Sequence, residues 1–234
     1  MVEKIVLVPA RGGSKRLKNK NIKTLIDRPL IYYTLDVVVD MFDEVIVPTD
    51  SDEIFQIVKE HSNKVIPIKR PKELATDTSK VLETVNWFFL ENNLQNKNGQ
   101  IWMCLPTCPL RNSSDIKKAK KMLTKKADGV IGITDFDFPP ILGFNMDEEN
   151  FITDYHSSKP FQNGNTRSQD HEKIYRPNGA FYGMWYESFY KYKSFYKGNI
   201  KGCYMPRERS LDIDTELDFK IIEQVIISKL EATD

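Results

Sequence analysis

The sequence predicts an α/β protein with a Rossmann-like, mostly parallel sheet and flanking helices, plus a β-rich excursion. Two observations predict this fold. Short apolar runs alternate with segments of helical periodicity along most of the chain, as in sheets whose strands are joined by crossover helices. One stretch, 135–178, interrupts that alternation with turn-rich sequence such as FPP, FQNGN and RPNG.

The predicted strands are short apolar runs, of which the first, KIVLVP, reads as a buried strand. The later runs follow at intervals that leave room for a helix or a turn between them. Together they cover residues 4–9, 44–48, 64–68, 101–105, 129–134, 179–185, 201–205 and 210–213.

Six helices are expected, over 29–39, 52–61, 78–92, a Lys-rich segment after 112, 186–193 and 216–230. Pro29 opens the first, since proline is tolerated in a first helical turn. Ser113 or Ser114 is expected to cap the Lys-rich helix, whose apolar residues share one face: Ile116, Ala119 and Leu123. Thr215 and Asp218 resemble a capping box for the last helix. Its apolar stripe is predicted to be Leu217, Ile221, Val225 and Ile226.

Composition indicates one domain, 1–234, that binds neither nucleic acid nor membrane. Hydrophobic residues make up 40% and charged residues 29%, with a formal net charge of +1. A nucleic-acid binder usually has a basic excess. Three cysteines without a C-x-x-C argue against a disulfide framework and a zinc site. Neither a signal peptide nor a membrane-spanning run is recognisable, so we expect a cytoplasmic protein.

The excursion at 135–178 is too long for an ordinary connection within a compact domain. Its aromatic content argues against plain disorder. The aromatic residues are Phe136, Phe138, Phe144, Phe151, Tyr155 and Phe161. We expect an inserted subdomain that packs on a second subunit, which makes the protein a homodimer through 135–178.

A glycine-rich, basic loop follows the first strand and predicts a phosphate site. Gly12 and Gly13 allow tight turns that aim backbone N–H groups at one anion, and Arg11, Lys15 and Lys20 neutralise its charge. The pattern is neither a P-loop nor G-x-G-x-x-G. The alternative is a solvated basic turn. The predicted contacts are Ala10, Arg11, Gly12, Gly13, Lys20 and Asn21.

Two carboxylates near the end of the chain predict a metal site. Asp212 and Asp214 lie one residue apart on a predicted strand, so alternation places both on one face and Ile213 in the core. Oxygen donors without His or Cys suit Mg²⁺, with Mn²⁺ as an alternative. The competing interpretation is an Asp pair at a strand end, one of which caps the next helix.

The chain resembles the acylneuraminate cytidylyltransferases, the CMP-sialic acid synthetases and their relatives, in several motifs that occur in order. These are VPARGGSKRLKNKN at the start, then T-D-S (49–51), RPKELATDT (70–78), PTCPLR (106–111), RSQD (167–170), YRPNGAFY (175–182) and LDIDTELD (211–218). The resemblance implies transfer of CMP from CTP to the anomeric hydroxyl of an acidic nine-carbon sugar, with release of pyrophosphate. It places the metal at Asp212 and Asp214, and Arg11 and Lys20 on the triphosphate.

The resemblance also assigns the nucleotide and sugar contacts. Arg70, Asp77 and Ser79 belong to a segment that the family uses around the base and ribose of the nucleotide. The alternative for Arg70 is that it only forms an ion pair at the surface. Arg111 has weaker support and is expected to fix its own loop. The carboxylate of an acidic sugar needs a cationic partner, and arginine is well suited because its guanidinium can donate two hydrogen bonds to one carboxylate. The predicted sugar contacts are Leu105, Thr107, Arg167, Gln169, Arg176 and Asn178, with Arg167 serving the neighbouring subunit. The alternative is that R-P-N-G only forms a turn.

One departure from the family bears on the sugar. Sialic acid synthetases commonly read Q-P-T-S-P-L-R, whereas this chain has Leu105 in place of the glutamine and no lysine in 137–144. An apolar pocket suits a sugar with deoxy or methyl-bearing positions, such as legionaminic acid.

Three other classes stay open. One is a nucleotidyltransferase for Kdo or another sugar, and another is a catalytically silent nucleotide-binding subunit. The third is a D-x-D glycosyltransferase, although that motif normally falls mid-chain.

Overall fold

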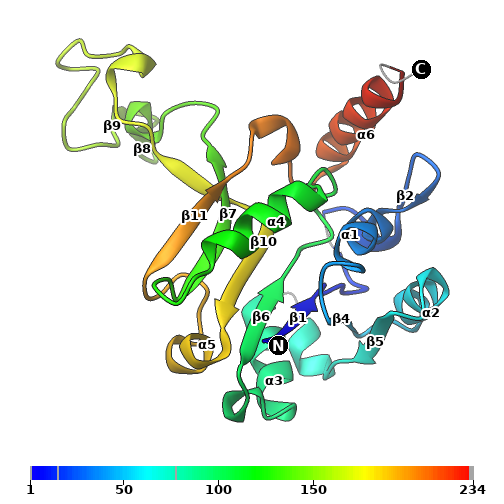
Figure 1. Ribbon diagram of the computed structural model, residues 1–234. Coiled ribbons are helices and arrows are strands. Elements are labelled where there is room, and N and C mark those ends of the chain that lie inside the picture. Colours follow the sequence, from blue (N-terminus) through cyan, green and yellow to red (C-terminus); the bar gives the residue numbers. More distant parts are fainter. Residues whose placement is uncertain (1, 15, 77, 232–234) are drawn as a thin grey trace. The chain divides into compact units, whose positions relative to one another are not determined.

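The computed structural model describes residues 2–14, 16–76 and 78–231, and shows the predicted α/β fold. The main sheet contains β1 (Glu3–Leu7), β4 (Glu44–Thr49), β5 (Val65–Lys69), β6 (Gly99–Met103), β7 (Gly129–Asp135), β10 (Tyr175–Trp185) and β11 (Ile200–Tyr204). Their order is β11-β7-β10-β6-β1-β4-β5 (Figure 1).

The sheet is mostly parallel. β1 lies between β4 and β6 and is parallel to both, β4 is parallel to β5, and β11 is parallel to β7. β10 runs antiparallel to β6. Because β1, β4, β5 and β6 are parallel, the loops after them emerge at one edge of the sheet, where ligands bind in open α/β folds.

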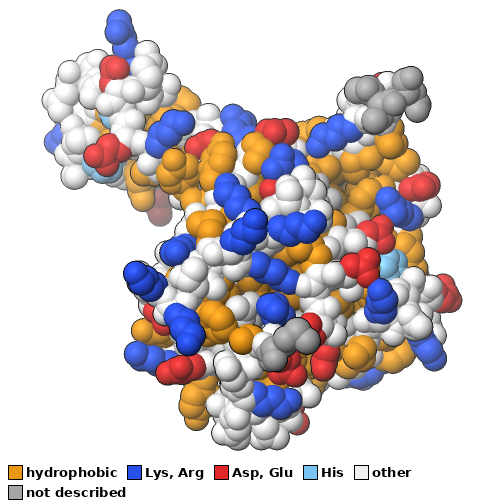
Figure 2. Space-filling view, viewed as in Figure 1, with side chains coloured by type: hydrophobic (Ala, Val, Ile, Leu, Met, Phe, Trp, Pro, Cys, Tyr) orange, Lys and Arg blue, Asp and Glu red, His pale blue; other side chains and the backbone are white. Residues whose placement is uncertain are grey.

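Helices cover both faces of the sheet. α1 (Leu30–Val38), α2 (Asp52–His61) and α4 (Ser113–Met122) pack in one core, and α3 (Val81–Glu91) and α5 (Tyr186–Tyr192) pack in the other. Successive strand residues divide between the two cores: Val6 packs with α1, whereas Leu7 packs with α3. Lys117, Lys118 and Lys121 of α4 are exposed, and Figure 2 shows basic side chains gathered over this helix.

The cap of α4 differs from the prediction. The N-cap is Asn112, and neither Ser113 nor Ser114 caps the helix. The Asn112 side chain accepts from the Asp115 N–H, and the Asp115 carboxylate accepts from the Asn112 N–H. Asparagine is as good an N-cap as serine, because its side-chain oxygen also accepts from a free N–H of the first helical turn. The cap therefore lies one residue before the predicted Ser113.

The predicted strand at 210–213 is wrong. This segment forms no strand and follows a 3₁₀ turn, and one backbone bond, from Ile213 N–H to the Thr107 carbonyl (2.9 Å), fixes it. Ile213 is nevertheless fully buried, while Asp212 and Asp214 line a pocket. The two carboxylates therefore face the same way, as predicted, without a strand ladder.

The last helix, α6 (Glu216–Glu231), begins with the predicted capping box. The Asp218 carboxylate accepts from the Thr215 N–H at 2.7 Å, and Thr215 Oγ1 accepts from the Asp218 N–H. The fully buried residues of this helix are Phe219 and Ile222, in a core that the opening loop shares. Half of the predicted stripe is confirmed, since Val225 and Ile226 pack against this core, whereas Leu217 (67% exposed) and Ile221 (44% exposed) do not.

The excursion corresponds closely to a second compact unit, Thr134–Pro177; the first unit comprises Met1–Ile133 and Asn178–Asp234. Within the second unit, one hairpin pairs β8 (Phe144–Met146) with β9 (Ile152–Asp154). Phe144 and Phe161 stack at 4.2 Å between ring centroids. Many of its large apolar side chains are exposed, among them Phe138, Met146, Phe151 and Tyr155.

Short elements complete the structure. β2 (Thr24–Leu25) and β3 (Arg28–Pro29) form a small hairpin before α1. Single 3₁₀ turns cover Lys20–Ile22, Lys72–Ala75, Leu94–Asn96, Pro140–Leu142, Ser168–Asp170 and Arg207–Arg209. Among the described residues, every helix is too short or too polar to cross a membrane.

Candidate functional site

A pocket of about 350 Å³ lies at the carboxyl ends of the parallel strands. Its walls come from the loops after β1, β5 and β6 and from the segment before α6. It brings together nine residues that the sequence singled out: Arg11, Lys20, Asn21, Arg70, Ser79, Leu105, Thr107, Asp212 and Asp214. Basic side chains and two carboxylates thus share one cavity.

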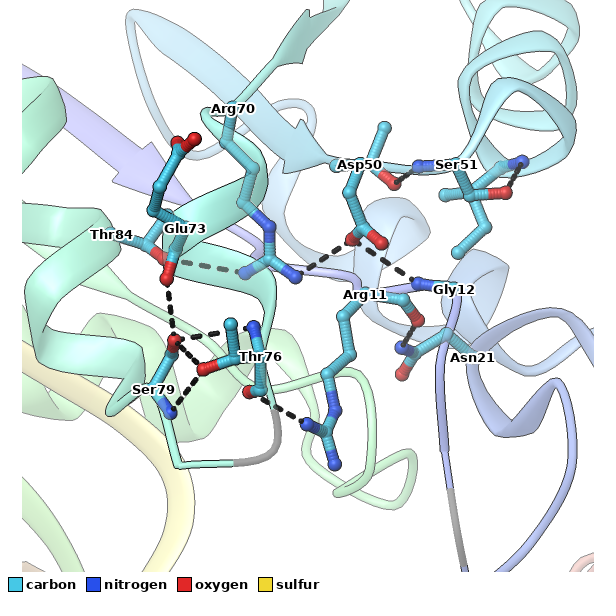
Figure 3. A network of polar contacts seen from close by, with 12 residues as sticks. Arg11, Gly12, Asn21, Asp50, Ser51, Arg70, Glu73, Thr76, Ser79 and Thr84 are labelled. Atoms are coloured by element: carbon cyan, nitrogen blue, oxygen red, sulfur yellow. Dashed lines mark hydrogen bonds and ion pairs between the residues drawn. The ribbon is translucent and has the colours of Figure 1, made fainter.

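Arg70 connects the opening loop to the rest of the site through Asp50 (Figure 3). Its guanidinium, 5% exposed, pairs with Asp50 at 2.8 Å and donates to the Thr84 hydroxyl at 3.3 Å. The Asp50 oxygen that pairs with Arg70 also accepts from the Gly12 N–H, at 3.3 Å. Arg70 is therefore in an ion pair, as the alternative interpretation held, although a buried one. Within 2–14, 16–76 and 78–231, its buried Nε has no hydrogen-bond partner.

Gly12 is needed for this arrangement because of close packing. A Cβ at this position would lie 2.9 Å from the Ser51 Cβ, which is closer than real Cβ contacts. Ser51 is in turn fixed as the N-cap of α2, where its hydroxyl accepts from the Ile54 N–H. The loop after β1 can therefore approach the loop after β4 only if residue 12 has no side chain.

A second set of contacts joins the opening loop to the loop after β5. Arg11 donates to the Thr76 carbonyl at 3.2 Å, and Asn21 donates to the Arg11 carbonyl at 3.0 Å. The Thr76 and Ser79 hydroxyls lie 2.6 Å apart, and Ser79 also donates to the Glu73 carbonyl. Figure 3 shows these side chains converging from two loops. The segment around Thr76 and Ser79, which we predicted to contact base and ribose, is thus bonded to the predicted phosphate loop through Arg11.

The acidic side of the pocket is formed by Asp212 and Asp214. Asp212 keeps contact with solvent, yet the protein atoms packed around its carboxyl raise the pKa of that group, and the Thr107 hydroxyl opposes this effect. The charge of Asp214 raises the same pKa further, and Lys20 lowers it. The two carboxylates are therefore close enough to repel each other, and a cation between them would relieve that repulsion.

Asp214 is held by two cations of the opening loop. Arg16 Nη1 lies 3.1 Å from one carboxylate oxygen, and Lys20 Nζ lies 3.1 Å from the other. Lys20 also donates to the Ile213 carbonyl at 2.6 Å. Arg16 was part of the basic run in the sequence, but the list of predicted contacts omitted it.

The Leu105 loop is fastened by Arg111. This arginine is 2% exposed and donates to the Thr34 hydroxyl at 2.7 Å and to the Leu105 carbonyl. Its role is the one expected for it, because it ties the loop after β6 to α1. Leu105 lines the pocket together with Pro106 and Thr107.

Cys108 is a contact that the sequence did not single out. Its thiol is fully buried, 3.1 Å from the Asn178 carbonyl and 3.5 Å from an Asp212 oxygen. Burial raises the pKa of this thiol, and the charge of Asp212 raises it further. Gly179 has a φ of +74°, and a Cβ there would lie 3.0 Å from the sulfur. The thiol therefore packs as a neutral group behind Asp212.

Asn178 does not line the pocket, contrary to expectation. Its side-chain NH₂ donates to Ser210 Oγ at 2.9 Å and to Met205 Sδ, and its oxygen accepts from the Ala180 N–H. The side chain is 2% exposed, and both its N–H donors and its oxygen are bonded inside the protein. The turn interpretation of R-P-N-G is also incomplete, because these residues begin β10.

The remaining predicted residues lie elsewhere. Ala10 is buried and its N–H donates to the Pro48 carbonyl, so it contributes to the sheet edge. Gly13 is exposed beside the pocket and does not line it. Asp77 lies outside the described residues. Arg167, Gln169 and Arg176 belong to the second unit, where Gln169 sits in a 3₁₀ turn and Arg176 in β10.

The chemistry of the donors fits a divalent ion only if a ligand completes the coordination. In the described part of the chain, no three His, Cys, Asp or Glu side chains cluster as a metal site. Two carboxylates in a cavity with basic walls suit Mg²⁺, which takes few protein ligands and keeps waters or phosphate oxygens.

Two solved structures share the fold of this chain. The structure of CMP:2-keto-3-deoxy-manno-octonic acid synthetase complexed with CTP has a TM-score of 0.67, at 14% identity over 97% of this chain and 99% of that chain. The 4-diphosphocytidyl-2C-methyl-D-erythritol synthase of Anaerococcus prevotii has a TM-score of 0.66, also at 14% identity, over 96% and 98% of the chains. At this identity the likeness shows the fold alone.

The sequence shows the family. The cytidylyltransferase family model matches residues 5–230, and the chain belongs to this family. It is 30% identical to an N-acylneuraminate cytidylyltransferase of Streptococcus agalactiae, over 92% of this chain and 51% of that protein. It is also 30% identical to a pseudaminic acid cytidylyltransferase of Campylobacter jejuni, over 96% and 97% of the chains.

A third relative, a CMP-N,N'-diacetyllegionaminic acid synthase of Legionella pneumophila, is 28% identical over 97% of this chain and 98% of that protein. The chain thus spans about half the length of the N-acylneuraminate cytidylyltransferases that it matches, and nearly all of the other two relatives.

Proposed function

We propose that this protein transfers CMP from CTP to the anomeric hydroxyl of a nonulosonic acid, a sialic-acid-like sugar, and releases pyrophosphate. One observation carries the proposal: a single pocket at the carboxyl ends of β1, β5 and β6 is lined by Arg11, Lys20 and Arg70 together with Asp212 and Asp214. Membership of the cytidylyltransferase family and full-length relatives that bear this activity in their names support it.

The basic residues would bind the triphosphate. The reaction joins two anions, so the protein must align them and offset their repulsion, and positioning with charge stabilisation dominates such transfers. Arg11 and Lys20 supply positive charge on the wall formed by the opening loop. The anomeric oxygen of the sugar attacks the α-phosphorus of CTP. A bond forms between that oxygen and the phosphorus as the bond from the phosphorus to the pyrophosphate oxygen breaks. The proton of the attacking hydroxyl passes to a base.

The nucleoside would lie against the wall from Arg70 to Ser79. Arg70 lines the pocket, and its buried Nε has no hydrogen-bond partner among the residues that the structure describes. Buried donors normally have acceptors, so an unpaired one beside a cavity favours an acceptor on a ligand. The Thr76 and Ser79 hydroxyls line the same wall.

Asp212 and Asp214 would hold a divalent ion, Mg²⁺ or Mn²⁺. When bound, such an ion would offset phosphate charge and acidify the attacking hydroxyl. Asp212 has a second candidate role as the base that takes the hydroxyl proton, because its pKa is raised above that of an ordinary aspartate.

Leu105 favours an acceptor sugar with deoxy or methyl-bearing positions over plain N-acetylneuraminate. Its side chain lines the pocket where related proteins commonly have glutamine, and unlike glutamine it offers no hydrogen bond to a sugar hydroxyl. Both kinds of sugar occur in the names of the relatives, and their names therefore do not choose between them. Arg167, Gln169 and Arg176 remain proposed sugar contacts from the second unit.

We also propose a homodimer through the second unit. Its apolar residues are exposed to an extent unusual for a stable surface, with Phe138 at 61% and Phe151 at 67%. A cluster of exposed apolar side chains commonly marks a protein interface. A cytoplasmic location is part of the same proposal, since CTP is an intracellular metabolite.

A pyrophosphate-release assay tests the activity. CTP, UTP and GTP are each combined with Mg²⁺ and a panel of N-acetylneuraminate, legionaminate, pseudaminate and Kdo. The proposal expects release with CTP and at least one nonulosonic acid, fastest with a deoxy or methyl-bearing one. A preference for plain N-acetylneuraminate would reject the assignment based on Leu105. Release only with Kdo would favour the first alternative, and no release with any pair would favour a silent nucleotide-binding subunit.

A further inference from the structure

The paired state of Asp214 suggests how metal and nucleotide depend on each other. Both oxygens of this carboxylate are occupied by cations of the opening loop, Arg16 on one and Lys20 on the other. A divalent ion that binds Asp214 must compete with these two positive charges. The same two side chains line the pocket proposed for the triphosphate.

We propose that Arg16 and Lys20 exchange Asp214 for the nucleotide phosphates, so that the phosphates uncover the metal-binding carboxylate. In the absence of nucleotide the two cations neutralise Asp214 and disfavour a divalent ion there. Phosphate oxygens that draw Arg16 and Lys20 away leave Asp214 with an uncompensated charge. The inference rests on the proposed function, and it adds Arg16 as a nucleotide-binding residue.

The two cations differ in how readily they can leave. The Arg16 side chain is 69% exposed, so water solvates its guanidinium in either position and the exchange costs little. Lys20 is 15% exposed and also donates to the Ile213 carbonyl at 2.6 Å. An ammonium has three donors, and two of these are engaged with the 213–214 segment. Lys20 can therefore keep the Ile213 contact while it turns a donor toward a phosphate.

The exchange makes metal and nucleotide binding mutually favourable. If nucleotide binding removes positive charge from Asp214, the metal binds more tightly in its presence, and by linkage the nucleotide binds more tightly in the presence of metal. The pocket would then take up the metal–nucleotide complex in preference to either component alone.

Arg16→Met tests the inference, because it removes the charge, keeps the length of the side chain and spares the partly buried Lys20. Lys18→Met is the matched control, since Lys18 is an exposed basic residue of the same loop that does not line the pocket. Two affinities are measured: Mn²⁺ binding without nucleotide, by electron paramagnetic resonance of free Mn²⁺, and CTP binding in EDTA, by calorimetry.

The expected signature is a pair of opposite changes. Arg16→Met should bind Mn²⁺ about two- to fivefold more tightly, the range of an exposed ion pair, and should bind CTP more weakly by at least a similar factor. Lys18→Met should match the wild type in Mn²⁺ affinity. Raising the KCl concentration to about 0.5 M should shrink the gain in Mn²⁺ affinity, because salt screens the exposed Arg16 charge.

The outcomes separate the inference from the proposed metal site. If Arg16→Met weakens both affinities, Arg16 only maintains the loop and the exchange is wrong; unchanged Mn²⁺ affinity also rejects it. Asp214→Asn is measured alongside. If that variant binds Mn²⁺ like the wild type, the metal does not use Asp214, and both the site and the exchange are rejected. If Asp214→Asn loses Mn²⁺ while Arg16→Met does not gain it, the metal site stands and only the exchange fails.

Discussion

Replacing Asp50 with alanine leaves the buried charge of Arg70 without its counter-ion. Arg70 is 5% exposed and Asp50 22%, and their side chains meet at 2.8 Å. Removing one partner of a buried ion pair typically costs about 3–5 kcal/mol, and the partial exposure of Asp50 places this pair near the lower end, at about 3 kcal/mol. The Gly12 N–H also loses its acceptor, which adds about 1 kcal/mol.

Thermal unfolding followed by circular dichroism measures this loss. A chain of this length loses about 2–4 °C in Tm per kcal/mol, so Asp50→Ala should unfold roughly 6–16 °C below the wild type. Asp52→Ala is the control, because Asp52 is 96% exposed and the loss of its solvent-screened pairing with Lys69 should leave Tm nearly unchanged.

A second substitution distinguishes an isolated charge from lost packing. Adding Arg70→Met to Asp50→Ala removes the unpaired cation and should recover about 1–2 kcal/mol, since apolar replacements of both partners of a buried pair are often tolerated. If Asp50→Ala melts within 2 °C of the wild type, or if the double variant is less stable than the single one, Arg70 does not depend on Asp50 and the reasoning is refuted.

Three further predictions concern the site and its support. Asp214→Asn should fold normally and lower CTP-dependent turnover by more than about 100-fold, or about 2.7 kcal/mol of transition-state stabilisation; wild-type turnover would remove the metal assignment. Gly179→Ala should lower the unfolding free energy by at least about 1 kcal/mol in urea titration, because its φ is +74° and the Cys108 sulfur lies in the way; an unchanged midpoint would contradict this. The Asn199 N–H, donating to Asp128, holds the pKa of that carboxyl below its ordinary value. Its contribution to stability is therefore present above the unfolded-state pKa of about 4 and disappears as the pH falls through the lower folded-state pKa. Asp128→Asn should lower the free energy of unfolding at pH 7 and should make that free energy depend less on pH at the acid end. If the unfolding free energies of variant and wild type run parallel over the whole pH range, the prediction is wrong.

The opening loop shows how far sequence reasoning reached in the site. Two glycines and a basic run after a buried strand predicted an anion site, which stays a prediction, and three residues of this segment line the pocket: Arg11, Lys20 and Asn21. The partners of these residues were not predictable. Lys20 meets the Ile213 carbonyl 193 residues away, and Arg11 meets the Thr76 carbonyl 65 residues away. No local pattern specifies such pairs.

Asn178 and the segment before α6 show two ways in which local patterns misled. Asn178 is a polar residue in a recognised motif, yet Ser210 and the Ala180 N–H satisfy its side chain inside the protein. The alternation that predicted a strand at 210–213 gave the correct direction of Asp212 and Asp214, although no neighbouring strand pairs with this segment. Side-chain alternation is a property of extended backbone, whereas a strand also needs a partner at the right place.

The sequence by itself determined the α/β class, the order of most strands and helices along the chain, and the family. These follow from hydrophobic periodicity and from the order of short motifs, which depend only on residues near one another in the sequence. Only the tertiary structure decided which charges meet. Asp50 binds Arg70, and Asp214 is held by Arg16 and Lys20, because loops from separate strands converge at one edge of the sheet. That convergence results from packing the two cores against the sheet, which brings together residues that no short stretch of sequence contains.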